Sequence, residues 1–348
     1  MSAVDIGGPR QPLLRVQHLK KHFLLKRGGL GLSRGPRPAV RAVDGVSFEI
    51  LRGETLGVVG ESGCGKSTTA RILMQLIVQD SGELVFDGLA VGSRDLPLRD
   101  FRRQTQMVFQ DSYSSLNPRM TIEDSVAFGP TVHGVSGRYA LNRAHDLLAR
   151  VGLEPARFAG RYPHELSGGQ RQRVNIARAL ALEPRLVILD EAVSALDKSV
   201  EAQVLNLLED LKRDFGLTYL FISHDLHVVR YMSDRVLVMY LGQVVEVGTS
   251  AQVFDAPRHP YTRALLRSMP SGDPMQRTTE APLSGDPPNP IDPPSGCRFH
   301  TRCPFAEPLC GNATPKLTAL DRMGHQAACY MAIPGSGHSL APPQGVQP

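Results

Sequence analysis

Short apolar runs alternate with stretches of helical spacing over residues 13–248. Three runs are clear strand candidates, and each ends where glycines or polar residues begin: Thr55–Val59, Leu186–Leu189 and Tyr219–Ile222. Between the last two runs, apolar residues recur every three or four positions, as on one buried face of a helix: Val200, Val204, Leu207, Leu208 and Leu211. This alternation predicts an α/β domain built on a parallel sheet.

The rest of the chain has a different pattern. Residues 96–160 carry helical patches such as Leu141–Val151 and few strand signals, so a helical subdomain is predicted over about 96–180. Residues 249–268 are short and partly helical, whereas the chain from Pro270 onward is dense in Pro and Gly, which is typical of a semi-extended linker or surface wrap. We therefore expect a main domain over 13–248 and a C-terminal extension over 249–348.

Composition narrows the classes of function. Of 348 residues, 41% are hydrophobic and 21% charged, which permits a packed core. Lys and Arg number 39 against 34 Asp and Glu, a small excess, and Trp is absent, so no nucleic-acid partner is expected. No apolar run reaches the roughly 18 residues of a membrane-spanning helix, and the N-terminus lacks a secretory pattern, so we expect a cytosolic protein.

A phosphate-binding loop follows the first strand candidate. Residues 60–67 fit the pattern G-x-x-x-x-G-K-S and precede a helical pattern. Glycines let backbone N–H groups converge on phosphates, Lys66 supplies charge to the β- and γ-phosphates, and the Ser67 hydroxyl coordinates Mg²⁺. The predicted nucleotide-binding residues here are Gly60, Glu61, Ser62, Gly63, Cys64, Gly65, Lys66, Ser67 and Thr68.

Two carboxylates follow the strand at Leu186–Leu189. Asp190 suits a ligand of hydrated Mg²⁺, because hard cations prefer oxygen. Glu191 is placed to orient or deprotonate an attacking water. Two acids after a strand are by themselves more typical of a solvated loop, and it is the phosphate-binding loop upstream that favours hydrolysis of a nucleoside triphosphate.

Further motifs resemble those of the ATPases of ABC transporters. Leu166–Gln170 resembles the ABC signature, Gln110 the Q-loop, Asp197 at the end of Ser194–Asp197 the D-loop, and His224 the switch histidine. Phe23 is placed like the aromatic residue that stacks on adenine. The resemblance implies a P-loop fold of the ABC type, catalytic roles for Glu191, His224 and Gln110, and Mg²⁺ contacts from Ser67, Gln110 and Asp190.

The same resemblance implies a dimer with ATP in its interface. Two nucleotide domains of this family pack head to tail, and each ATP lies between one phosphate-binding loop and the partner's signature helix. The signature residues and the D-loop then bind the nucleotide across the interface: Ser167, Gly168, Gly169, Gln170 and Asp197. The partner is a paralogue or a second copy. Plainer interpretations remain open: an ordinary helix cap for the signature, a buried structural histidine for His224, and core packing for Phe23.

Segments outside the catalytic motifs resemble the ATPases of oligopeptide and dipeptide importers: Ser112–Met120, Arg161–Glu165, His259–Thr262 and Gly296–Pro304. This implies a peripheral subunit on the cytoplasmic face of the inner membrane. It would power peptide import through two permease subunits. An extracytoplasmic substrate-binding protein would deliver the peptide to them. Nickel importers share much of the pattern. A soluble ABC ATPase of translation or DNA repair usually carries two nucleotide domains or a long coiled-coil insertion, and this chain has neither.

Four of the five cysteines lie near the C-terminus, with the spacing C-x5-C-x6-C-x18-C: Cys297, Cys303, Cys310 and Cys329. Zinc sites favour two to four residues between paired ligands, and a reducing cytosol disfavours disulfides. Four thiolates on a weakly packed segment suit a 4Fe-4S cluster acting as a crosslink, and similar tails in peptide importers support this. Four reduced structural thiols are the alternative.

Overall fold

The computed structural model describes residues 11–25, 37–269, 285–286 and 288–343. The extreme N-terminus and much of the predicted Pro-rich linker lie outside these residues. The chain divides into two compact units: residues up to 15, 49–55 and 84–225 form the first, and residues 16–48, 56–83 and 226 onward form the second. Four strands have residues in both units: β1 (Pro12–Leu24), β2 (Ala39–Leu51), β3 (Thr55–Val59) and β4 (Ser81–Phe86).

Three parallel strands form the sheet of the first unit. β7 (Leu186–Asp190) pairs on one side with β6 (Thr105–Val108) and on the other with β8 (Thr218–Ile222). Every residue of β7 and β8 is buried, which explains their unbroken apolar sequences. Helix α7 (Lys198–Phe215) connects β7 to β8, beginning after the Asp197 cap and ending at Gly216, whose φ is 61°. The predicted strand–helix–strand unit is confirmed.

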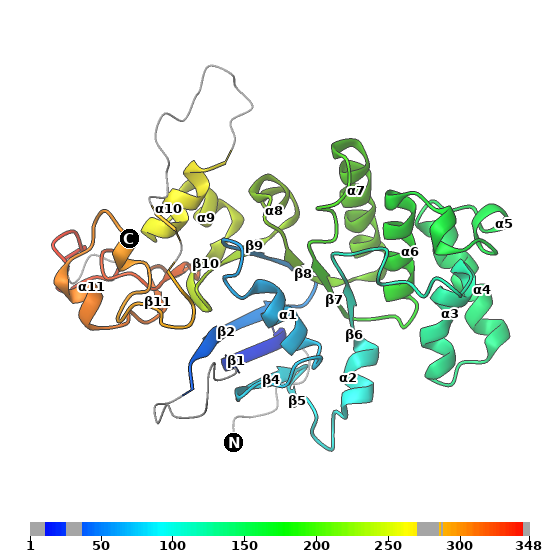
Figure 1. Cartoon of the computed structure of the whole chain (residues 1–348), viewed down its shortest axis with the longest axis horizontal. Coiled ribbons are helices and arrows are strands. Elements are labelled where there is room, and N and C mark those ends of the chain that lie inside the picture. Colours follow the sequence, from blue (N-terminus) through cyan, green and yellow to red (C-terminus); the bar gives the residue numbers. More distant parts are fainter. Residues whose placement is uncertain (1–10, 26–36, 270–284, 287, 344–348) are drawn as a thin grey trace, which may run out of the picture. The chain divides into compact units, whose positions relative to one another are not determined.

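Helices fill much of the remaining first unit (Figure 1). These helices pack against one another through small apolar faces, and α3 packs against both α4 and α6. The Arg143 guanidinium of α4 donates to the carbonyl of Ala181 at 2.8 Å, which satisfies the end of α6. The elements are β5 (Leu89–Ala90), α2 (Leu98–Gln104), α3 (Ile122–Val132), α4 (Gly137–Arg150), α5 (Pro155–Phe158), the 3-10 turn η1 (Pro163–Glu165) and α6 (Gly168–Leu180).

One strand inside the predicted helical stretch was missed. The sequence analysis placed few strand signals in residues 96–160, yet β6 lies there and is parallel to β7, with Met107 opposite Ile188. β6 has only four residues, so its sequence is too short to display a strand period. The position of β6 matters for the site because Gln110 lies two residues after the end of this strand.

The second unit contains a mixed sheet, so the prediction of a parallel sheet holds only in part. β3 is parallel to β9 (Arg235–Tyr240), but β10 (Gln243–Thr249) returns antiparallel to β9 through a tight turn at Leu241 and Gly242. Both turn residues have positive φ, 43° and 78°, as this kind of hairpin requires. The Gly242 N–H donates to the Cys64 carbonyl at 2.8 Å, so the turn supports the segment after β3.

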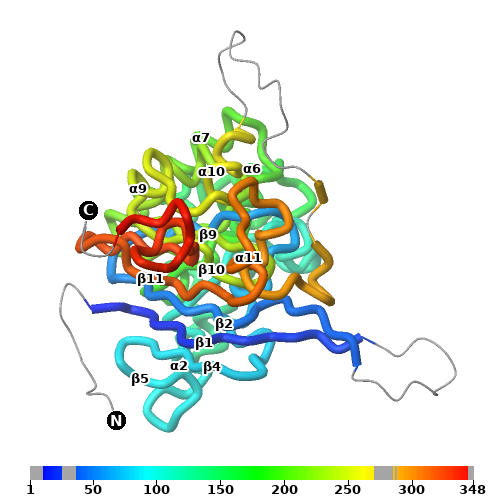
Figure 2. Tube along the Cα trace, turned by 90° about the vertical axis from the view of Figure 1, so that its left-hand side faces the viewer, coloured from blue at the N-terminus to red at the C-terminus, as the bar shows by residue number. Residues whose placement is uncertain are grey.

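The C-terminal segment adds two short strands to the sheet of the second unit. β12 (Gln326–Ala327) is antiparallel to β10, and β11 (Thr318–Ala319) is antiparallel to β12. Figure 2 shows this orange-to-red part of the trace beside β10. The predicted helical character of 249–268 is confirmed by α9 and α10. The helices of the unit are α1 (Lys66–Leu73), α8 (Leu226–Met232), α9 (Ser250–Asp255), α10 (Pro260–Arg267), α11 (Pro308–Asn312) and the 3-10 turn η2 (His300–Arg302).

No helix within the described ranges combines the length and hydrophobicity needed to cross a bilayer. No boundary between the two compact units falls at residue 248. The domain bounds of 13–248 and 249–348 therefore stay a prediction.

Candidate nucleotide-binding and hydrolysis site

The loop between β3 and α1 is shaped by glycines that no other residue could replace. Gly60 and Gly65 have φ of 152° and 108°. A Cβ at Gly60 would lie 2.2 Å from the Met239 carbonyl oxygen, and one at Gly65 would lie 2.2 Å from that of Ala42. The backbone therefore passes closer to its neighbours than a side chain permits, as a phosphate-binding loop requires.

Lys66 is held at the centre of this loop. Its ammonium donates to the carbonyls of Gly60 at 2.7 Å and Glu61 at 3.1 Å, and the residue is buried. Cys64 is buried beside it, and burial raises the pKa of the thiol, which makes Cys64 a packing residue. A glycine cradle, a positive charge and the start of α1 form a donor set that fits a phosphate chain.

The carboxyl ends of three neighbouring strands bring together the predicted catalytic residues. Gln110 follows β6, Glu191 follows β7 and His224 follows β8. The Gln110 amide Nε2 donates to Glu191 Oε2 at 2.9 Å, and His224 Nδ1 lies 3.3 Å from the same oxygen. This edge of a parallel sheet is where α/β proteins commonly place their chemistry.

The backbone of Glu191 is unusual. Its φ is 51°, in the left-handed region that non-glycine residues seldom adopt. Its N–H donates to the Ile222 carbonyl at 2.9 Å, and its own carbonyl accepts from the Ser194 hydroxyl at 3.0 Å. These bonds hold a strained residue in place, a pattern typical of functional positions. Asp190, at the end of β7, is buried with a relative exposure of 4%.

The signature and D-loop residues both cap helices in this chain. Ser167 caps α6, with its hydroxyl accepting from Gln170 N–H at 3.4 Å while the Gln170 side chain accepts from Ser167 N–H at 3.0 Å. Asp197 caps α7 by accepting from Val200 N–H at 2.9 Å, which lowers the pKa of its carboxyl. Ser167 remains exposed, so its cap does not close the helix start to a second ligand. Contacts of these residues with a nucleotide stay a prediction.

Phe23 does not belong to the core. The side chain is 38% exposed, and the Lys21 ammonium lies 5.7 Å from its ring centroid. This exposure removes the core-packing alternative. Adenine stacking on Phe23 remains a prediction.

Two residues near the loop, Tyr261 and Arg302, were named in the sequence analysis only within segments that resemble peptide importers, and their contacts with the loop were not predicted. The Tyr261 hydroxyl accepts from the Glu61 N–H at 2.8 Å, and the Arg302 guanidinium binds the Glu61 carboxylate. They lie 200 and 241 residues from Glu61, so no local pattern could reveal these contacts.

All four C-terminal cysteines line one pocket, together with His259 and Phe299. Cys297 N–H donates to the Cys310 carbonyl at 2.7 Å, which brings the two segments together. Burial raises the pKa of Cys297 to about 12 and that of Cys329 to about 11. Every cysteine is free. Within the described residues, no three His, Cys, Asp or Glu side chains are arranged to hold a metal ion.

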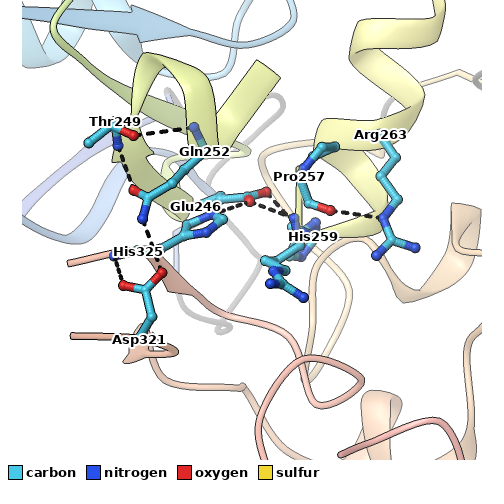
Figure 3. Close-up of polar contacts among 9 residues, drawn as sticks. Glu246, Thr249, Gln252, Pro257, His259, Arg263, Asp321 and His325 are labelled. Atoms are coloured by element: carbon cyan, nitrogen blue, oxygen red, sulfur yellow. Dashed lines mark hydrogen bonds and ion pairs between the residues drawn. The ribbon is translucent and has the colours of Figure 1, made fainter. Parts of the chain in front are cut away.

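A buried polar network adjoins this pocket (Figure 3). Glu246 is fully buried and accepts from His259 N–H at 2.9 Å and from His325 Nε2 at 2.8 Å. His259 Nδ1 accepts from Tyr261 N–H at 3.0 Å, so a neutral ring carries its proton on Nε2. That buried Nε2 has no hydrogen-bond partner among the described residues. It is an unsatisfied donor on a residue that lines the cysteine pocket.

Comparisons with known proteins agree with this geometry. The model of the ABC transporter family matches residues 43–194, and that of the oligopeptide/dipeptide transporter C-terminal region matches 245–310. A protein of Sinorhizobium fredii named as a probable peptide ABC transporter ATP-binding protein is 48% identical over 97% of each chain. The oligopeptide transport ATP-binding protein AppF of Bacillus subtilis is 47% identical over 92% of this chain and 98% of its own.

The fold is shared with a dimeric bacterial ABC transporter cassette. That structure has a TM-score of 0.58 and 29% identity, and the match covers 68% of this chain and 98% of the other. Fold and site together define a P-loop ATPase of the ABC type. The chain belongs to the family of ATP-binding proteins of peptide and oligopeptide ABC transporters.

Proposed function

We propose that the chain is the subunit that hydrolyses ATP to power import of di- or oligopeptides. The observation that carries this is the Glu191 carboxylate, which lies within reach of both Gln110 and His224 in a chain with an intact phosphate-binding loop. Glu191 would accept the proton of the attacking water, while Gln110 and His224 orient it and contact the γ-phosphate. The peptide substrate is supported by the relatives named for peptide transport.

Magnesium suits the chemistry of three predicted residues. Ser67, Gln110 and Asp190 would hold the ion by hydroxyl, amide and carboxylate oxygens, the ligands Mg²⁺ prefers. Bound there, it would neutralise charge on the β- and γ-phosphates. Lys66 holds the phosphates from the loop, and Phe23 provides an exposed ring for the base.

A head-to-tail dimer would complete the site. The start of α6 is capped only through Ser167 and Gln170, and Ser167 is exposed, so its N–H dipoles can receive a partner's nucleotide. The dimeric structure of a related cassette supports this arrangement. The second subunit would be a copy of this chain or a paralogue.

Permease subunits would dock beside Gln110 at the cytoplasmic face of the inner membrane. The segment that resembles peptide importers, Ser112–Met120, is tied to the signature helix: Asn175 Nδ2 donates to the Ser112 carbonyl at 3.0 Å, and Arg178 contacts the Ser115 carbonyl. Movement of α6 on ATP binding would therefore be passed to this surface and to two permease subunits. A substrate-binding protein would act indirectly, by delivering peptide to them.

Reconstitution with the permeases encoded beside it would test this function. Peptide-loaded binding protein should stimulate ATP hydrolysis and drive peptide into vesicles, and Glu191→Gln should abolish both. Stimulation by nickel instead of peptide would favour the related metal importers. Co-purification with ribosomes or DNA and no permease would overturn a transport role.

The cysteine pocket would hold a 4Fe-4S cluster. All four cysteines line one cavity, and His259, whose buried Nε2 has no partner among the described residues, lines it too. In the part of the chain that the structure describes, no three His, Cys, Asp or Glu side chains are arranged to hold a metal ion, so the shared pocket of the four cysteines is what supports this proposal. The cluster would supply a crosslink for a segment with little apolar surface. Anaerobically purified protein should be brown and contain about four irons per chain, and colourless, iron-free protein would contradict the assignment.

A further inference from the structure

Glu61, inside the phosphate-binding loop, is held from two sides by the C-terminal region. Arg302 Nη1 and Nη2 bind its two carboxylate oxygens at 2.9 Å and 3.1 Å, a two-point pair. The Tyr261 hydroxyl accepts from its backbone N–H at 2.8 Å. The Arg302 side chain is only 6% exposed and that of Glu61 19%, so water screens this pair poorly.

The same loop residue also contacts the phosphate-binding lysine. The Glu61 carbonyl accepts from Lys66 Nζ at 3.1 Å, so the orientation of Glu61 helps to set the position of the ammonium. The Glu61 carboxylate carries a negative charge close to where a triphosphate binds. Arg302 both fixes this side chain and neutralises it.

The residues that hold Glu61 are parts of the cysteine pocket wall or lie next to it. Arg302 directly precedes Cys303, and the turn η2 lies between Cys297 and Cys303. The Phe299 ring, which lines the pocket, lies 5.4 Å from the Tyr261 ring and 5.4 Å from the Tyr240 ring. Tyr240 also accepts from Arg302 at 3.3 Å. Packed rings thus connect the pocket with both contacts to Glu61.

We propose that Arg302 and Tyr261 are positioning residues of the phosphate-binding loop, through which the state of the cysteine pocket sets the affinity for nucleoside triphosphate. The inference rests on the proposed nucleotide site. A loop held in its binding shape has less conformational freedom to lose when the nucleotide binds, so the restraint raises affinity. If the cysteine segment loosens, Arg302 and the Phe299 packing move, and Glu61 is released.

Equilibrium binding of MgATP to the isolated full-length chain tests the first step. Arg302→Gln and Tyr261→Phe should each weaken binding by roughly 5- to 20-fold, the scale of one lost hydrogen bond to a charged or buried group. The exposed residues Arg322 and Tyr139 provide matched controls, and Arg322→Gln and Tyr139→Phe should leave the affinity unchanged. Circular dichroism of every variant checks its folding.

A double variant separates positioning of the loop from neutralisation of the Glu61 charge. Glu61→Gln in the Arg302→Gln background removes the uncompensated charge beside the phosphates but does not restore the restraint, so the double variant should regain only part of the lost affinity. If Arg302→Gln does not fold, Glu61→Gln alone still tests the pair, and it should weaken binding only a few-fold because the charge leaves with the restraint. Full recovery of the affinity in the double variant, which still lacks the restraint, would overturn the positioning role and leave charge neutralisation alone.

Cys303→Ser tests the link to the pocket. It should weaken MgATP binding in the wild-type background and have a smaller effect beside Arg302→Gln, because part of its effect acts through Arg302. Independent, additive losses would overturn the link. Iron analysis of each sample makes this result independent of the cluster assignment. A wild-type chain that binds no MgATP would overturn the proposed function, whereas normal binding that none of these variants alters would overturn only this inference.

Discussion

Gln110 and Glu191, 81 residues apart, are joined by a hydrogen bond of 2.9 Å between the amide Nε2 and the carboxylate Oε2. His224 Nδ1 approaches the same oxygen at 3.3 Å. The same oxygen of Glu191 therefore lies close to both Gln110 and His224, the two residues that the family resemblance links to sensing of the γ-phosphate. The side chain expected to activate water is oriented by the residues expected to detect the nucleotide.

Replacing this carboxylate should separate binding from hydrolysis. Glu191→Gln keeps the size of the side chain but removes the base, so MgATP should bind normally while turnover falls by roughly 10²- to 10⁴-fold. Phosphate release at saturating ATP measures the rate, and light scattering should show a dimer that persists with MgATP. Hydrolysis at the wild-type rate would refute the role of Glu191.

Replacing His224 separates a catalytic role of this residue from a structural one, because its side chain is 62% exposed. His224→Ala should leave the melting temperature within about 1–2 °C, since surface substitutions usually change stability by less than about 0.5 kcal/mol. Turnover should nevertheless fall by roughly 10²-fold or more. A large drop in melting temperature with normal specific activity would instead identify a structural histidine.

Lys66 provides the charge for the phosphates and is itself buried. Lys66→Met keeps the aliphatic stem and removes the ammonium that Gly60 and Glu61 hold, so binding of MgATP should fall beyond detection at micromolar nucleotide. Titration with a fluorescent ATP analogue measures this. Lys316→Met, at an exposed position, is the matched control. Retained affinity in Lys66→Met would count against the loop assignment.

Most candidate residues of the site could be predicted from the sequence because the motifs are local. Gly60–Ser67 and Asp190–Glu191 each follow a strand, and their chemistry is visible within eight residues or fewer. The strands β3, β7 and β8 were predicted within one residue at their ends, since buried strands in a parallel sheet are continuous apolar runs.

What the sequence did not reveal depends on contacts between distant segments. β6 has too few residues for a periodic signal, and the antiparallel strand β10 has no feature that distinguishes it from a parallel one. The restraint of Glu61 by Arg302 joins residues 241 positions apart. His259 was noted as part of a family resemblance, but its burial beside Glu246 follows only from tertiary packing.

Burial of His259 should make the second unit less stable in mild acid. Burial lowers the pKa of its imidazole to about 4, an effect that Arg263 reinforces and Glu246 opposes, while in the unfolded chain the pKa stays at the ordinary 6.5 of histidine. Between these values the unfolded state binds the proton and the folded state does not, so stability is complete above pH 6.5 and is lost as the pH falls. The loss attributable to His259 is about 1 kcal/mol at pH 5.5 and roughly 3 kcal/mol at pH 4.

Chemical denaturation at pH 7.0 and pH 5.5 measures this loss. His259→Asn retains an acceptor for the Tyr261 N–H but has no proton to gain, so its stability should fall by about 1 kcal/mol less than that of the wild type over this interval. The exposed His164 is the matched control, and His164→Asn should follow the wild-type profile. Equal losses in the wild type and His259→Asn would show that this buried ring is not the origin of the acid sensitivity.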